Sequence, residues 1–199
     1  MPLDTPLPHL AERAHDATNV SEDSDLADIR AAASGNRLAQ SALVTRHMPR
    51  VYALAMRMLG DAALAEDISQ EAFLRAWKQL PKWEPRAKFS TWLHRVTLNL
   101  CRDHFRKRRE QTMDELPERT DPDLRPDERL DQTQRTTSLM NAIDSLPERQ
   151  RAALVMCSLE GRSNIDAAAI MDVSIEALES LLARARRKLK ADVLNRGED

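Results

Sequence analysis

The chain has 199 residues, a length that suits one ordinary domain or two small ones, and only two residues are cysteines, so no disulfide framework is expected. No apolar run approaches the roughly 18 residues that a membrane span needs, and the first residues lack the basic and apolar regions of a signal peptide. The net charge of −2 gives no overall attraction to nucleic acid. We therefore expect a reduced, cytoplasmic protein without a membrane span.

The charges are nonetheless gathered into blocks of opposite sign. Residues 1–28 and 110–131 are acidic, whereas residues 86–109 hold eight Lys and Arg side chains against a single Asp. A second basic block, with five cations in residues 184–190, lies near the C-terminus. Two basic blocks between acidic segments suggest two contacts with nucleic acid, although solvated helix faces would give the same charge pattern.

The predicted elements are helices throughout, because the chain has only four glycines and no segment in which β-branched residues alternate with polar ones. Residues 1–20 are expected to form a disordered leader, and residues 22–33 a short helix. A longer helical period covers residues 38–59, and Pro49 inside it predicts a kink or a new helix start.

Gly60 is expected to end this helix, and Asp61 to cap the next one, which covers residues 62–80. A proline-flanked loop over residues 81–85 then leads into a helix over residues 90–109. The positions expected on the inner face of that helix are Leu93, Val96, Thr97, Leu100 and His104.

Residues 110–133 are predicted to be a flexible acidic linker. Within this segment, residues 110–131 hold nine acids and three prolines and show no apolar period. Because nothing in the linker is apolar enough to fix the flanking domains against each other, we expect those domains to sample many separations. The chain is thus predicted to be all-α, with two small helical domains over residues 21–109 and 134–195.

The second domain contains the pattern of a helix-turn-helix. Ser163 and Asp166 form a capping box for a short helix over residues 165–171. After a tight turn, Ser174 is expected to cap a longer helix that ends in clustered arginines. Such a helix can enter the major groove with its first residues at base edges, although an αα-hairpin that only packs would share the spacing.

An acidic and amide face is predicted on the helix over residues 62–80. Asp67, Gln70 and Glu71 are three and four residues apart, so their side chains are neighbours on the helix surface. Such a face suits a basic or polar partner, although an exposed acidic face is usually only solvated.

Three aromatic residues, Trp83, Phe89 and Trp92, are interleaved with cations in the segment that follows. Aromatic rings beside cations are what melted DNA needs, because bases stack on the rings while the backbone follows the charge. At least one of the rings is expected to belong to the core instead.

His94, Cys101 and His104 fall at helical spacing, so a metal site can be considered, and with it an enzyme. A fourth ligand would have to come from a partner helix, and none is evident. The sequence also lacks a glycine-rich phosphate loop and a Ser/His/Asp set at motif spacing. We therefore expect no metal, no cofactor and no catalytic activity.

The runs at residues 65–77, 89–93 and 146–150 are the motifs AEDISQEAFLRAW, FSTWL and LPERQ, and the two stretches that hold them resemble the extracytoplasmic-function sigma factors of bacterial RNA polymerase. Residues 41–109 resemble conserved region 2, through AEDISQEAFLRAW at residues 65–77 and FSTWL at residues 89–93. Residues 144–193 resemble region 4, through LPERQ at residues 146–150. The resemblance implies a helix bundle for region 2, a helix-turn-helix bundle for region 4, and a protein that binds core polymerase and directs it to promoters.

The resemblance also implies roles for individual residues. The face of Asp67, Gln70 and Glu71 falls where the family docks on the coiled coil of the polymerase β′ subunit. The residues placed at the −10 element are Lys82, Trp83, Arg86, Lys88, Trp92, Arg95, Asn99, Arg102, Arg106, Lys107 and Arg108. Those placed at the −35 element are Ser174, Glu176, Glu179, Ser180, Arg184, Arg187 and Lys188.

The recognition helix departs from the family pattern. Asp172 stands where the turn often has Gly, and Glu179 and Leu181 lie in a run that is usually richer in Gly, Thr, Lys and Arg. Asp visits left-handed backbone conformations more readily than most residues, and Glu can accept a hydrogen bond from cytosine N4. An unusual −35 sequence is therefore expected.

The implied partners are the β′ and β subunits of core polymerase and promoter DNA, and the implied role is control of a stress regulon. The linker motivates a further hypothesis, that an anti-sigma protein holds the chain inactive by binding both domains at once. The alternative function is a stand-alone helix-turn-helix regulator. It would explain residues 134–193, but not the acidic face beside an aromatic and basic helix.

Overall fold

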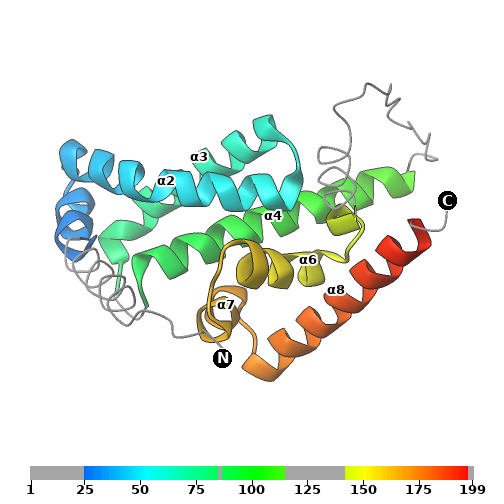
Figure 1. Ribbon diagram of the computed structural model, residues 1–199. Coiled ribbons are helices and arrows are strands. Elements are labelled where there is room, and N and C mark those ends of the chain that lie inside the picture. Colours follow the sequence, from blue (N-terminus) through cyan, green and yellow to red (C-terminus); the bar gives the residue numbers. More distant parts are fainter. Residues whose placement is uncertain (1–24, 85–86, 115–141, 197–199) are drawn as a thin grey trace, which may run out of the picture.

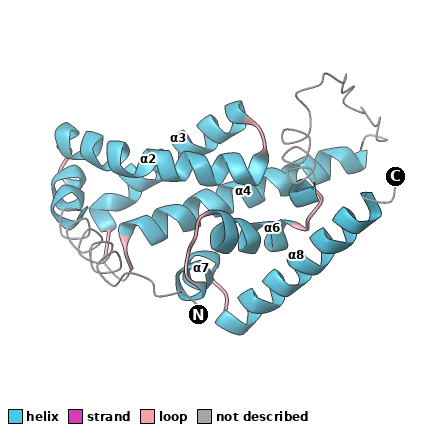
Figure 2. Cartoon of the chain, in the orientation of Figure 1, coloured by secondary structure: helices cyan, strands magenta, loops and turns pink. Residues whose placement is uncertain are grey.

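The computed structural model describes residues 25–84, 87–114 and 142–196, and every regular element in these ranges is a helix. Figure 2 draws these helices and the loops that join them. None of the described helices is long and apolar enough to cross a membrane. The expected leader over residues 1–20, Arg86, and the expected linker from residue 115 onward lie outside the described residues.

The N-terminal half begins with a helix over residues 25–33 and continues with α2 (Arg37–Leu59), α3 (Ala62–Gln79), the 3₁₀ turn η1 (Leu80–Lys82) and α4 (Phe89–Asp114). Local signals end and start these helices as the sequence predicts. Gly60 takes the left-handed conformation, with φ 69°, and ends α2. The Asp61 carboxylate accepts a hydrogen bond from the Leu64 N–H at 3.0 Å and caps α3.

Two helices in this half run further than the sequence predicts. α2 is continuous through Pro49, so the expectation of a new helix start there is wrong. Proline removes one backbone hydrogen bond, but Val51 and Leu54 are buried in the turn that follows and hold the helix in place. α4 continues to Asp114, so the first residues of the expected linker, from 110 to 114, are helical instead.

The C-terminal half consists of α6 (Glu148–Leu154), the π-helical turn η2 (Val155–Leu159), α7 (Asn164–Met171) and α8 (Ile175–Arg196). The Ser163 hydroxyl accepts from the Asp166 N–H at 3.1 Å and caps α7. Asp172 adopts the left-handed conformation, with φ 56°, and Ser174 caps α8 by accepting from the Ala177 N–H at 3.2 Å. The predicted helix-turn-helix geometry is confirmed.

The two halves share one core. In Figure 1, α4 lies between the α2–α3 pair and the α6–α7 pair, and α8 packs against α6. One cluster of buried side chains joins Leu98 of α4 to Met156 and Leu178 of the C-terminal half. Separating the halves would expose this apolar surface to water. In this structure the two halves are docked on each other, whereas the linker predicts domains that sample many separations.

α4 is buried on two faces, of which the sequence predicted one. Leu93 and Leu100 pack in the core of the N-terminal half, as expected. Leu98 and Cys101 belong to the shared cluster on the other side. α4 therefore contacts helices of both halves. The candidate binding surface also lies on α4.

Candidate nucleic-acid interface

Three aromatic side chains meet where the loop after η1 enters α4. The ring of Phe89 stacks on Trp92 at a centroid distance of 6.0 Å, and Trp83 lies edge-on to both, at 5.7 and 5.2 Å. Phe89 is buried and belongs to the core, as predicted for at least one ring. Trp83 and Trp92 are half-buried, so part of each indole remains accessible to a stacking base.

A cavity of about 330 Å³ adjoins the aromatic cluster on the surface that α3 and α4 share. Its lining offers an indole, two amides and two cations, the groups that can hold a base and its phosphate. The lining residues are Arg75, Lys78, Gln79, Trp92, Val96 and Asn99. No α3 residue was predicted at this site. Their spacing of three and four residues, which puts Arg75, Lys78 and Gln79 on one helix face, was the available signal.

Two of the arginines predicted to contact DNA are held by the C-terminal half. Arg95 Nη2 donates to the backbone oxygen of Ala169 at 2.5 Å and lies 3.3 Å from Asp172 Oδ1. Arg102 Nε donates to Glu148 Oε1 at 2.7 Å. Both arginine side chains keep about two fifths of their surface exposed, 41% and 42%. These ion pairs must break before either guanidinium can turn fully toward a phosphate.

The other described cations of the predicted −10 set remain on the surface. Arg106 pairs with Asp103 of its own helix at 3.1 Å, and such surface ion pairs contribute little, so a phosphate can replace the carboxylate. The exposed cations are Lys82, Lys88, Arg106, Lys107 and Arg108. The described residues of the predicted −10 set therefore lie on α4 or in the turn and loop before it.

The predicted acidic face lies on the solvent side of α3, where Asp67 and Gln70 are exposed. Glu71 accepts a hydrogen bond from Arg75 Nε at 2.8 Å, and this bond holds the pKa of Glu71 below its ordinary value. Leu74, which was not predicted as part of this face, is 51% exposed one turn further along the helix. An exposed apolar side chain with acidic side chains around it has the arrangement of a protein interface, which has an apolar centre and a polar rim.

The helix-turn-helix presents the first turns of α8 to solvent. Leu178, Leu182 and Ala185 are buried and fix the helix against α6 and α7. The exposed members of the predicted −35 set are Ser174, Glu176, Glu179, Ser180, Arg184 and Arg187. Glu179 accepts from the Asn164 side chain at 3.4 Å, while Lys188 is half-buried and donates to the Ser145 backbone oxygen at 2.5 Å.

His94 connects the two halves beneath this surface. It is fully buried, its Nδ1 lies 2.6 Å from the Ser90 oxygen, and its Nε2 lies 2.9 Å from Arg162 Nη2. Nδ1 must therefore donate and Nε2 accept, which requires the neutral ring. Burial, and then the charge of Arg162, lower the pKa of His94 to about 4. Burial also raises the pKa of the Cys101 thiol on the same helix to about 12.

Replacing His94 by Gln should flatten the pH dependence of stability. The neutral ring contributes fully above the ordinary pKa of 6.5, and its contribution is lost as the pH falls toward 4, because the unfolded chain binds the proton first. The wild type should therefore lose about 2 kcal/mol of unfolding free energy between pH 7 and pH 5 that the variant does not lose. Urea denaturation at several pH values measures this difference.

His104→Gln, on the partly exposed side of the same helix, is the matched control and should follow the wild-type curve. Arg162, Arg50 and His47 are the charged or titratable neighbours of His94. Parallel curves for the wild type and His94→Gln would contradict the assignment of a neutral ring.

Comparison with known proteins matches each half of the chain to a family model. Residues 43–111 match the family model for sigma-70 region 2, and residues 136–189 match that for sigma-70 region 4. Over 169 residues the chain is 31% identical to the ECF RNA polymerase sigma factor SigM of Mycobacterium tuberculosis, a match that covers 84% of each protein. The chain belongs to the extracytoplasmic-function (ECF) sigma factors.

Other relatives agree with this membership. The ECF sigma factor SigE of Mycolicibacterium smegmatis is 37% identical over 152 residues, which are 74% of this chain and 59% of that protein. This ECF sigma factor thus spans about three fifths of that relative's length. A solved structure of CnrH in complex with the cytosolic domain of CnrY superposes with a TM-score of 0.63 at 29% identity, covering 86% of this chain and 97% of that one. The all-helical architecture with regions 2 and 4 is therefore that of the family.

Proposed function

We propose that this ECF sigma factor binds core RNA polymerase and directs it to specific promoters, in the cytoplasm and for a stress regulon. One observation carries the proposal: the aromatic and basic surface of α4 and the recognition helix α8 lie on two halves of one chain, each of which matches a sigma region. Such a chain can contact two promoter elements at once. Its contribution is binding rather than catalysis.

The exposed surfaces divide into three contacts. The acidic face of α3, with Leu74 beside it, binds the coiled coil of the β′ subunit through opposite charge and apolar contact. At the −10 element, melted bases stack on Trp83 and Trp92 while the cations of α4 follow the backbone. At the −35 element, the first turns of α8 reach base edges in the major groove, and its arginines contact phosphates.

The docked arrangement of the two halves is the inactive one in this proposal. Arg95 and Arg102 can bind DNA fully only after Asp172 and Glu148 release them. Core polymerase would open the molecule by binding the halves separately. A protein that binds both halves as they are docked would keep the chain inactive. CnrH was solved with the cytosolic domain of CnrY, and we infer that an anti-sigma protein plays that part here.

Reconstitution with core polymerase tests the proposal. The chain, added to core enzyme from its host and a randomised promoter library, should yield transcripts whose start sites share two upstream motifs. Footprints on a selected promoter should protect the −10 and −35 segments only when both proteins are present. Equal protection of duplex DNA by the chain alone, with no effect of core enzyme, would favour a stand-alone regulator instead.

A further inference from the structure

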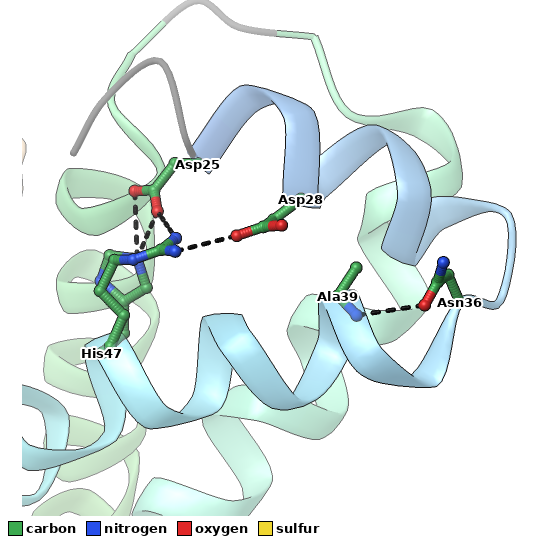
Figure 3. Close-up of polar contacts among 6 residues, drawn as sticks. Asp25, Asp28, Asn36, Ala39 and His47 are labelled. Carbon is green, nitrogen blue, oxygen red and sulfur yellow. Dashed lines mark hydrogen bonds and ion pairs between the residues drawn. The ribbon is translucent and has the colours of Figure 1, made fainter. Parts of the chain in front are cut away.

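A partly buried polar cluster of Asp25, Asp28, Arg46 and His47 joins the first described helix to α2 (Figure 3). His47 is 2% exposed, and its Nε2 lies 3.1 Å from both carboxylate oxygens of Asp25. Arg46 donates to Asp25 at 2.5 Å and to Asp28 at 2.9 Å. Burial works to raise the pKa of Asp25, but the hydrogen bonds and charges of His47 and Arg46 lower it below its ordinary value.

The imidazole of His47 also packs on the aromatic cluster. Its ring meets Phe89 edge-to-face, at a centroid distance of 5.3 Å and an angle of 73°. Phe89 in turn stacks on Trp92 and meets Trp83 edge-on. A continuous series of contacts therefore runs from a buried carboxylate, through two buried rings, to the two indoles that are partly exposed.

No hydrogen bond to a described residue fixes the indole of Trp83. The Nε1 of Trp83 is buried and has no hydrogen-bond partner among the described residues, so its position depends on ring packing. Phe89 is the first residue of α4, directly after the loop that carries Lys88. A shift of its ring would move both the start of the helix and the indoles that rest on it.

We propose that Asp25 and His47 are positioning residues for −10 recognition: Asp25 orients the imidazole of His47, which fixes Phe89 and thereby Trp83 and Trp92. This inference rests on the proposed function, because it assumes that the two indoles stack with promoter bases. Asp25 precedes the segment that matches region 2, so the family match does not by itself assign it a role.

The test uses holoenzyme assembled from the full chain and a labelled single-stranded oligonucleotide with the −10 segment of a promoter selected by reconstitution. His47→Gln removes the ring that packs on Phe89 but keeps an amide that can reach Asp25. Asp25→Asn keeps the shape and removes the charge. Asp28→Asn is the matched control. Asp28 lies on the same helix as Asp25 and pairs with Arg46 of α2, but it forms none of the described hydrogen bonds to His47.

Both His47→Gln and Asp25→Asn should weaken oligonucleotide binding about fivefold to tenfold, the loss expected for impaired stacking of one base. The salt dependence of binding should be unchanged, since no phosphate contact is lost. Asp28→Asn should bind within about twofold of wild type. A second measurement uses the free chain with Trp77 replaced by Phe. Acrylamide should quench the fluorescence of the two remaining, partly exposed indoles more readily in His47→Gln and Asp25→Asn, but not in Asp28→Asn.

Wild-type binding by a folded His47→Gln variant would overturn the proposal, and so would an equal loss in Asp28→Asn, which would mean that the cluster only anchors the helix. If His47→Gln does not fold, the oligonucleotide affinity of Asp25→Asn, compared with wild type and Asp28→Asn, tests the proposal in the same way. Trp92→Ala distinguishes this failure from that of the proposed function. Unchanged binding in Trp92→Ala would reject the −10 assignment itself, and the positioning role with it.

Discussion

Replacing Asp67 and Glu71 by Lys should abolish assembly with core polymerase while the helical content stays unchanged. The two carboxylates lie on the solvent side of α3, and their only described ion pair is the surface contact of Glu71 with Arg75, which contributes little to stability. Facing a basic partner, two reversed charges should weaken binding by at least about a hundredfold. Co-purification with tagged core enzyme and fluorescence anisotropy measure the loss.

Glu66→Lys tests the edge of the face, because Glu66 is exposed one turn before Gln70 but about 100° around the helix axis from Asp67. It should retain assembly within a few-fold of wild type. The neutral double variant, Asp67→Asn with Glu71→Gln, should bind core polymerase with an affinity between those of the doubly reversed variant and Glu66→Lys. Normal co-purification of the doubly reversed variant would reject α3 as the polymerase contact and leave the rest of the fold unaffected.

Replacing Arg151 by Ala should cost about 3 kcal/mol of unfolding free energy and loosen the contact between the halves. The Arg151 guanidinium is buried, donates to the Met58 oxygen of α2 at 2.8 Å and to the Asp144 oxygen, and lies 5.0 Å over the ring of Phe105. Its removal leaves buried carbonyl groups without donors and a void between α2, α4 and α6. Urea denaturation gives the free energy, and small-angle scattering gives the change in size.

Arg149→Ala serves as the control, since Arg149 is exposed two residues away on the same helix. It should change the unfolding free energy by less than about 0.5 kcal/mol, as surface substitutions usually do. A similar small loss in Arg151→Ala, with unchanged scattering, would mean that the apolar cluster alone holds the halves together.

Most of the helices and their ends could be predicted from the sequence because local chemistry decides them. Asp61, Ser163 and Ser174 cap the helices that they precede, and each needs only backbone groups two or three residues away. Asp172 takes the left-handed turn for the same kind of local reason. The exposed acidic face and the pair of Phe89 and Trp92 were likewise predictable, because helical spacing alone brings their members together. Trp83 joins that pair from the loop after η1 through tertiary packing.

Long-range contacts were not predictable from these patterns. Helical period assigned one inner face to α4, yet His94 and Cys101 are buried on another, because a second layer of helices packs there. Pro49 is accommodated within α2 because its neighbours are buried, which a local rule for proline does not include. The pair of Asp25 and His47 joins residues 22 positions apart in an arrangement that no short motif encodes.

The sequence by itself determined the all-helical class, the order of regions 2 and 4, and the residue types at each candidate contact. Only the tertiary structure decided which of those residues are accessible together. The sequence predicts Arg95 and Arg102 as DNA-binding cations. In the structure Arg95 pairs with Asp172 and Arg102 with Glu148, both from the other half of the chain. Burial of a shared apolar core sets that pairing, and such burial depends on how the helices pack rather than on the period of any one helix.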